Sequence, residues 1–163
     1  MLLLAVLAFV ACSGTTLKGD VYRADGLAFR LGGIPPTWTR LEVTNVRLAF
    51  RDEVAESTVL VNARCGNDSD DVPLQALMQH LFMTFTERET IEQSVVPMDG
   101  REVMHTLLRA KLDGVPKAFD AYVLKKDGCV YDFVLVSAPL KFEANRPAFE
   151  TFVSGFHTLH ENE

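Results

Sequence analysis

This sequence is short of basic residues. Lys and Arg number 16 against 22 Asp and Glu, which leaves a net charge of −6. An acidic surface repels phosphate backbones and no basic run interrupts it, so nucleic acid is a poor candidate partner. The chain has 163 residues, of which 48% are hydrophobic. That length and apolar fraction suit one folded domain, and they argue against a disordered chain or a multi-domain enzyme.

Groups suited to catalysis are also scarce. Only four His occur, and neither a G-x-S-x-G nor a C-x-x-C motif accompanies them. His80 falls in an expected helix on the side away from its apolar stripe, and His105 falls in an expected strand. We expect a solvated His80 and a hydrogen-bonded structural His105, because a nucleophile needs a base and an orienting partner together. The sequence therefore predicts no catalytic residues, no enzyme activity and no cofactor.

Two clusters resemble metal ligands without completing a site. His157 and His160 are three residues apart, which on a helix would put both rings on one face, but two ligands do not make a site. Asp68-Ser69-Asp70-Asp71 offers oxygen ligands but lacks the spacing of an EF-hand loop. Asp70 or Asp71 is better explained as the cap of the helix that follows. We expect no metal.

The first twelve residues indicate where the protein resides. Met1 to Ala11 is an uncharged, largely apolar run that is too short for the roughly 20 residues of a membrane-spanning helix. It fits the apolar region of a secretory signal. Followed by Cys12, it resembles the lipobox of bacterial lipoproteins, in which the Cys receives diacylglycerol and becomes the mature N-terminus. An ordinary cleaved signal and a frayed apolar N-terminus stay open as alternatives.

The lipobox resemblance implies a division of the chain. Residues 1–11 would be a signal peptide, residues 12–20 the lipidated Cys12 and a tether, and residues 21–163 a single domain with a frayed C-terminal tail. Ser13, with no Asp beside the Cys, resembles lipoproteins that are sent to the outer membrane. The expected location is thus the bacterial cell envelope, on an outer membrane surface that faces the periplasm.

The cysteine count agrees with an exported protein. Three Cys are an odd number, but Cys65 and Cys129 form an even pair once Cys12 carries lipid. Both lie at the edges of expected strands, and an oxidising envelope would let them form a disulfide. Two buried free thiols are the alternative.

A repeated turn is the clearest structural signal. Three of the Asp-Gly pairs follow one another at a spacing of 14 residues, at Asp99, Asp113 and Asp127. Asp-Gly between runs of alternating apolar residues is typical of two-residue hairpin turns. The pattern predicts a four-strand antiparallel meander, with strands at residues 89–98, 102–112, 117–126 and 129–137. The last strand is apolar on both faces, which is typical of a central strand.

Two amphipathic helices flank the meander. The first has Pro73 in its first turn and an apolar stripe from Leu74 to Phe85, and the second has Asn145 as its cap and Pro147 in its first turn. Shorter strands are expected near residues 27–31, 46–51 and 57–65. The sequence therefore predicts an α+β fold, in which a mainly antiparallel sheet and two helices form an α/β sandwich.

This order of elements resembles the Mog1/PsbP-like fold. The resemblance rests on the strand Leu27 to Leu31 followed by Pro35-Pro36-Thr37-Trp38, on the hairpin at Asp99-Gly100-Arg101, and on the closing helix with Phe149, Phe152 and Phe156. The stretch from Gly128 to Asp132 also resembles a group of uncharacterised bacterial lipoproteins. The resemblance implies binding functions, since such domains look like accessory subunits of photosynthetic complexes or regulators of a small GTPase.

The expected function is therefore that of a non-enzymatic, membrane-anchored envelope lipoprotein that binds a protein partner or serves as an accessory module. Trp38, the only Trp, is the candidate partner contact, because Trp is enriched at binding hot spots. The alternative for Trp38 is that it closes one end of the core. The alternative function is a periplasmic carrier of a small apolar ligand, in a pocket lined by Phe29, Phe82, Phe85, Phe133 and Phe152.

Overall fold

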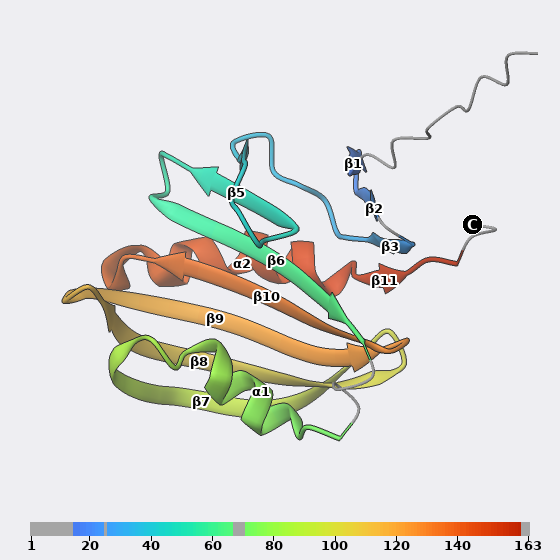
Figure 1. Cartoon of the computed structure of the whole chain (residues 1–163). Helices are drawn as coiled ribbons and strands as arrows, with labels where there is room; N and C mark the ends of the chain where they lie inside the picture. Colours follow the sequence, from blue (N-terminus) through green and yellow to red (C-terminus); the bar gives the residue numbers. More distant parts are fainter. Residues whose placement is uncertain (1–14, 25, 67–70, 161–163) are drawn as a thin grey trace, which may run out of the picture.

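The computed structural model describes residues 15–24, 26–66 and 71–160. Figure 1 shows a strongly twisted sheet with a helix on each side and a smaller sheet at one end. The elements, in chain order, are β1 (Thr16–Lys18), β2 (Val21–Ala24), β3 (Leu27–Arg30), β4 (Thr39–Leu41), β5 (Leu48–Asp52), β6 (Ser57–Cys65), α1 (Leu74–Leu81), β7 (Thr86–Met98), β8 (Arg101–Leu112), β9 (Val115–Lys126), β10 (Cys129–Ser137), a 3₁₀ turn (Pro139–Lys141), α2 (Phe142–Ser154) and β11 (His157–Thr158).

The large sheet is antiparallel, with seven strands in the order β4-β5-β6-β10-β9-β8-β7. Strands β7 to β10 are the predicted meander. Asp99, Asp113 and Asp127 each have positive φ, as do the Gly residues after them, which is the backbone of the two-residue hairpin turn. The α+β fold class and the four-strand meander are confirmed.

Strand β10 lies between β6 and β9 and is buried on both faces, as its sequence predicts. Its alternate residues supply two separate cores. Tyr131, Phe133 and Leu135 pack with α2 and the small sheet, whereas Val130 and Val134 pack with α1. The two helices thus cover opposite faces of the large sheet (Figure 1).

The two faces are covered unequally. On one face, α2 and the small sheet β1-β2-β3-β11 close the larger core. On the other face, α1 packs mainly against β8 and β9 and leaves β6 less covered. Along β6, Val59, Val61 and Ala63 are buried toward α2, but the intervening residues on the α1 side stay partly exposed. The fold therefore leaves an open stretch of sheet beside α1.

The first helix differs from its prediction at both ends. Its N-cap is Pro73, without a side-chain cap, so Asp71 does not cap it; Asp70 lies outside the described residues. The helix ends at Leu81 rather than Phe85. Phe85 keeps its apolar contact through a turn instead, since its ring packs against Phe119 at 5.0 Å. The helical spacing of apolar residues continues past Leu81, so the sequence pattern did not show where the helix ends.

The second helix starts earlier than predicted. It begins at Phe142, directly after the 3₁₀ turn, so Asn145 is not its cap and Pro147 lies beyond its first turn. Asn145 is buried inside the helix, and its amide donates to the carbonyl of Lys141 at 2.9 Å and to that of Ala55 at 3.2 Å. The sequence pattern predicted that the Asn145 side chain caps the helix. Its amide instead forms a long-range hydrogen bond to the β5–β6 loop.

Both cores and the disulfide are built from residues between Leu17 and Phe156. A hydrophobic core of its own is a general feature of a folded domain. Among the described residues, no helix has the length and apolar character needed to cross a membrane.

Candidate functional site

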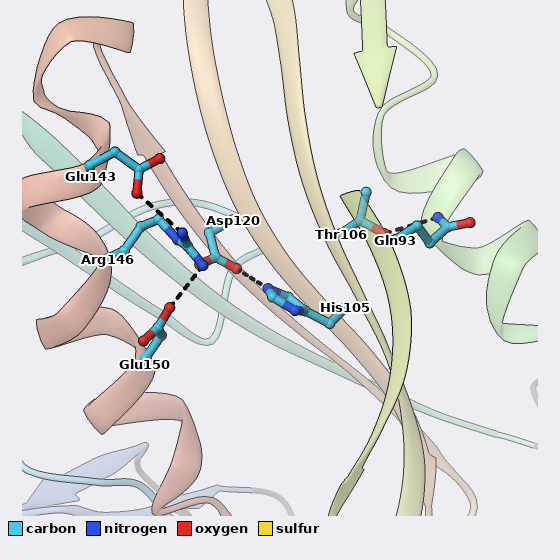
Figure 2. A network of polar contacts seen from close by, with 7 residues as sticks. All are labelled: Gln93, His105, Thr106, Asp120, Glu143, Arg146 and Glu150. Atoms are coloured by element: carbon cyan, nitrogen blue, oxygen red, sulfur yellow. Dashed lines mark hydrogen bonds and ion pairs between the residues drawn. The ribbon is translucent and has the colours of Figure 1, made fainter. Parts of the chain in front are cut away.

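A buried carboxylate lies beneath α2, at the centre of a polar network (Figure 2). Asp120 on β9 is fully buried and faces the α2 side of the sheet. One of its oxygens is 2.8 Å from Nε2 of His105 on β8, and the other accepts from Nε of Arg146 on α2 at 3.2 Å. The network therefore joins two strands to a helix.

Arg146 connects the buried Asp120 with two exposed carboxylates on α2. Its guanidinium also donates to Glu143 at 3.2 Å and to Glu150 at 2.9 Å, one helical turn to either side. Burial lowers the pKa of Arg146, but hydrogen bonds to Asp120 and Glu143 outweigh burial, and the pKa lies above its ordinary value. Arg146 is thus a permanent cation that compensates the buried carboxylate.

His105 is held by contacts on two sides of its ring. Its ring stacks on Tyr122 with centroids 4.2 Å apart, and burial raises the pKa of that tyrosine. Ser94 lies opposite His105 in the β7–β8 register. In the part of the chain that the structure describes, however, no Ser, Thr or Cys side chain hydrogen-bonds to His105. Through Asp120, the network links α2 to strands β8 and β9 of the sheet.

A second buried carboxylate faces the opposite side of the sheet. Asp132 on β10 has a side chain only 3% exposed, and it pairs with Arg64 on the neighbouring strand β6, whose side chain is 50% exposed. Nη1 and Nη2 of the guanidinium both donate to the carboxylate, the longer distance being 3.4 Å between Nη2 and Oδ1. Burial raises the pKa of Asp132, and the Arg64 charge opposes that shift.

Arg64 stands at the edge of an open hollow of about 690 Å³ between α1 and the ends of β6 and β10. We call it the Arg64 hollow; it is lined by Arg64, Cys65, Gly66, Val72, Ala76, Leu77, His80 and Val130. A second hollow of about 550 Å³ adjoins it, shares Arg64 and Cys65, and includes Arg47. Binding sites for small molecules are commonly of this size, about 300–1,000 Å³, and largely apolar.

The predicted site residues lie in different places. Cys65 and Cys129 are opposite each other in the β6–β10 register and form a disulfide at the rim of the Arg64 hollow. Cys12 lies outside the described residues. Trp38 is partly buried, and its ring is 5.3 Å from that of Phe152 and 5.9 Å from that of Phe50. It packs against the larger core.

The five Phe residues proposed to line one apolar pocket lie in two different cores. Phe29, Phe133 and Phe152 are fully buried in the larger core, and Phe82 is buried in the smaller one. Phe85 packs against Phe82 and Phe119. These rings fill the two cores, and the Arg64 hollow lies elsewhere.

His157 and His160 are not on a helix, since α2 ends at Ser154. The His157 ring instead bonds to Asp99 in the β7–β8 turn. Over residues 15–24, 26–66 and 71–160, no three side chains of the metal-ligating kinds gather into a site. His80 is exposed on α1, as predicted.

Asp99 ties the C-terminal segment to the meander. Its buried carboxylate accepts from Nζ of Lys126 at 2.5 Å and from the backbone N–H of Thr158 at 2.9 Å, in addition to the His157 contact. Burial would raise the pKa of Asp99, but hydrogen bonds from Lys126, Thr158 and His157 lower it below its ordinary value.

No protein-family model matches the chain, and no curated protein matches its sequence. Solved structures do match. The cyanobacterial PsbP (CyanoP) of Synechocystis has a TM-score of 0.63 at 19% identity, over 96% of this chain and 99% of that one. The chain has a Mog1/PsbP-like fold.

Two further solved structures with this fold also match the chain. The Ran-binding protein Mog1p of Saccharomyces cerevisiae matches with a TM-score of 0.60 at 12% identity, over 84% of this chain and 92% of that one. LpqN, involved in cell envelope biogenesis of Mycobacterium tuberculosis, matches with a TM-score of 0.58 at 12% identity, over 82% and 86%. At these identities the likeness concerns the fold alone.

Sequence reasoning missed both buried carboxylates. Each nevertheless carries a signal, because Asp132 is the one charge in β10 and Asp120 is the one charge in the apolar middle of β9, residues 118–124. Charged residues are seldom fully buried unless paired, so each Asp predicts a nearby cation. The identity of that cation is not readable locally, since Arg64 and Arg146 come from distant parts of the chain.

Proposed function

We propose that this protein is a non-enzymatic, lipid-anchored protein of the bacterial envelope that binds another protein as an accessory subunit. The observation that carries the proposal is the Mog1/PsbP-like fold. Solved proteins with this fold include one named for binding Ran and one involved in cell envelope biogenesis. These neighbours support a binding role and leave the partner to be identified.

The proposed location rests on all three cysteines, two in a disulfide and one in the lipobox-like segment. The disulfide between Cys65 and Cys129 supports an oxidising compartment, since such bonds persist outside the cytosol. The lipobox-like segment ending at Cys12 supports cleavage after residue 11 and lipidation of Cys12. Ser13 after the Cys supports an outer membrane location that faces the periplasm. A tether to residue 20 would then hold the domain near that membrane.

We infer a non-enzymatic role from the contacts of His105. The ring of His105 is held by Asp120 and stacked on Tyr122, and Asp120 also compensates Arg146. These contacts account for the buried polar residues under α2 as a structural clamp.

A cross-linking pull-down from intact envelopes tests the proposal, with an affinity tag after Glu163. We expect one dominant partner at a fixed ratio to the bait. The matched control is Cys12→Ala, which removes the proposed anchor and leaves the folded domain intact, so the partner yield should fall as confinement at the membrane is lost. Recovery of the bait without any partner would contradict the binding role.

Trp38 is the first side chain to exchange in that experiment. It is only partly buried, so one part of the indole is available to a partner while the other packs on Phe152. Trp38→Phe keeps an aromatic ring on the core. If Trp38 contacts the partner, this variant lowers the cross-linked yield without changing the free energy of unfolding by more than about 1 kcal/mol.

A further inference from the structure

We propose that the Arg64 hollow binds a small amphipathic anion, with its apolar body against α1 and its anionic group on Arg64. The inference rests on the geometry of the hollow and does not require the lipid anchor or a protein partner. In this proposal the ligand binds Arg64, which is the exposed member of the Arg64–Asp132 ion pair.

The hollow offers an apolar surface of defined extent. Val72, Ala76 and Leu77 line it from the side of α1, and Val130 lines it from β10. It stays open because α1 packs mainly on β8 and β9 and does not cover the ends of β6 and β10 (Figure 1). An apolar ring system or short acyl chain that enters it removes the exposed parts of Val72, Ala76 and Leu77 from water, and contacts Val130, which is already buried.

Arg64 supplies the polar anchor. Its guanidinium has five N–H donors, and the Asp132 contacts involve two of its three nitrogens. Half of the side chain stays exposed at the hollow, whereas Asp132 is 3% exposed and does not line it. The carboxylate therefore fixes the orientation of the guanidinium from below. A fixed guanidinium suits planar carboxylate-like groups, which it binds through two parallel hydrogen bonds.

The charges around the hollow select an anion. Every titratable side chain among the described residues that line the two adjoining hollows is basic, namely Arg47, Arg64 and His80. The chain as a whole carries a net charge of −6, but no carboxylate is among the described residues that line the two hollows. Asp132, which pairs with Arg64, lies beneath them. An anionic ligand is attracted there, and a cationic one is not.

The first test compares two probes that share an apolar body. These are 2-naphthoate and its uncharged amide, 2-naphthamide, titrated into oxidised residues 13–163, the part that contains both cores. Amide chemical shifts in the NMR spectrum report where each probe binds. We expect saturable shifts at Val72, Leu77 and Val130, and an affinity for the carboxylate about tenfold above that for the amide, since hydrogen bonds to charged groups are the stronger.

Two variants separate the apolar from the anionic contact. Ala76→Phe fills the hollow from α1 and should abolish the shifts from both probes. Arg64→Gln combined with Asp132→Asn replaces the ion pair by a neutral pair, so that no buried charge is left alone. This double variant should weaken naphthoate about tenfold and leave naphthamide unchanged. Arg109→Gln, at an exposed position on β8, is the matched charge control and should bind as the parent does.

Three results would overturn the proposal. They are naphthoate shifts that lie elsewhere or never saturate, equal affinities for the two probes, and naphthoate binding that is unchanged in Ala76→Phe. The amide spectrum of each variant shows whether that variant is folded. The two variants alter different elements, so if one of them fails to fold, the other still tests the proposal.

Discussion

At the scale of single residues, the molecule is organised around carboxylates that its own strands bury. Asp120 and Asp132 lie on adjacent central strands and face opposite sides of the sheet. Each is compensated by one Arg, from α2 in the first case and from β6 in the second. A buried ion pair stabilises little by itself, but removal of one partner is costly because the other stays desolvated. These positions are therefore sensitive ones.

Asp120→Asn tests this sensitivity beneath α2. The variant keeps the shape of the side chain but removes the charge that Arg146 and His105 face. We expect the free energy of unfolding to fall by about 2–3 kcal/mol, measured by urea denaturation at neutral pH. The control is Glu143→Gln, an exposed partner of the same Arg146, which should cost less than about 0.5 kcal/mol. Equal losses in the two variants would contradict the clamp.

Asp99 makes a contribution that depends on pH. Burial opposes ionisation, but hydrogen bonds from Lys126, Thr158 and His157 prevail, and the folded pKa is lowered. A lowered folded pKa means that the stabilisation is present above the pKa of an unfolded Asp, about 3.9, and is lost as the pH falls through the folded pKa. The charge of Asp99 therefore stabilises the protein at neutral pH and ceases to do so in acid.

Asp99→Asn isolates this contribution, because Asn suits the same turn. We expect the parent to exceed the variant by about 1–2 kcal/mol in unfolding free energy near neutral pH, and the gap to shrink below about pH 4. Urea denaturation across that pH range gives both values. Asp113→Asn, in an equivalent turn, is exposed and should show no such trend. A gap that widens in acid would refute the assigned sign.

At the scale of elements, local chemistry decides some boundaries and distant contacts decide others. The Asp-Gly turns fixed the meander because their backbone requirement is local, and positive φ at Asp99, Asp113 and Asp127 bears this out. The predicted start of α2 was wrong because Asn145 bonds across the fold to Ala55 instead of capping the helix. Of the small sheet only β3 was predicted, as residues 27–31. Its other strands were missed because strands as short as His157–Thr158 carry almost no periodic signal.

A contact between two glycines sets how α2 meets the small sheet. A Cβ on Gly32 would lie 2.0 Å from the carbonyl oxygen of Thr151, and one on Gly155 would lie 2.3 Å from Cα of Gly32. The Gly32 N–H also donates to the carbonyl of Phe152 at 2.7 Å. The end of α2 and the chain after β3 therefore touch backbone to backbone, which only residues without a Cβ allow.

Gly32→Ala should force these segments apart. We expect a loss of about 2–3 kcal/mol, as for overpacked cores, measured as a lower urea midpoint with an unchanged slope. Gly33→Ala is the neighbouring control, because nothing lies within 4 Å of a Cβ at that position. It should change the unfolding free energy by less than about 0.5 kcal/mol. A tolerated Gly32→Ala would show that the contact is not tight.

At the scale of the whole molecule, one face of the sheet is closed and the other is partly open. Two elements, α2 and the small sheet, complete the larger core, whereas α1 alone covers the opposite face. The periodicity of the sequence predicted a sheet with two amphipathic helices packed on it and the central place of β10. It could not predict the hollow beside Arg64, which depends on where a short helix comes to rest on the sheet.

The intact mass of the protein recovered from its own membranes tests the central claim most directly. The account predicts a chain that starts at Cys12, carries an acylated glyceryl group, and lacks the hydrogens lost when Cys65 and Cys129 join. Cys12→Ala should yield no acylated species. A mature chain without the acyl group, or one that still begins at Met1, would contradict the lipid-anchored account.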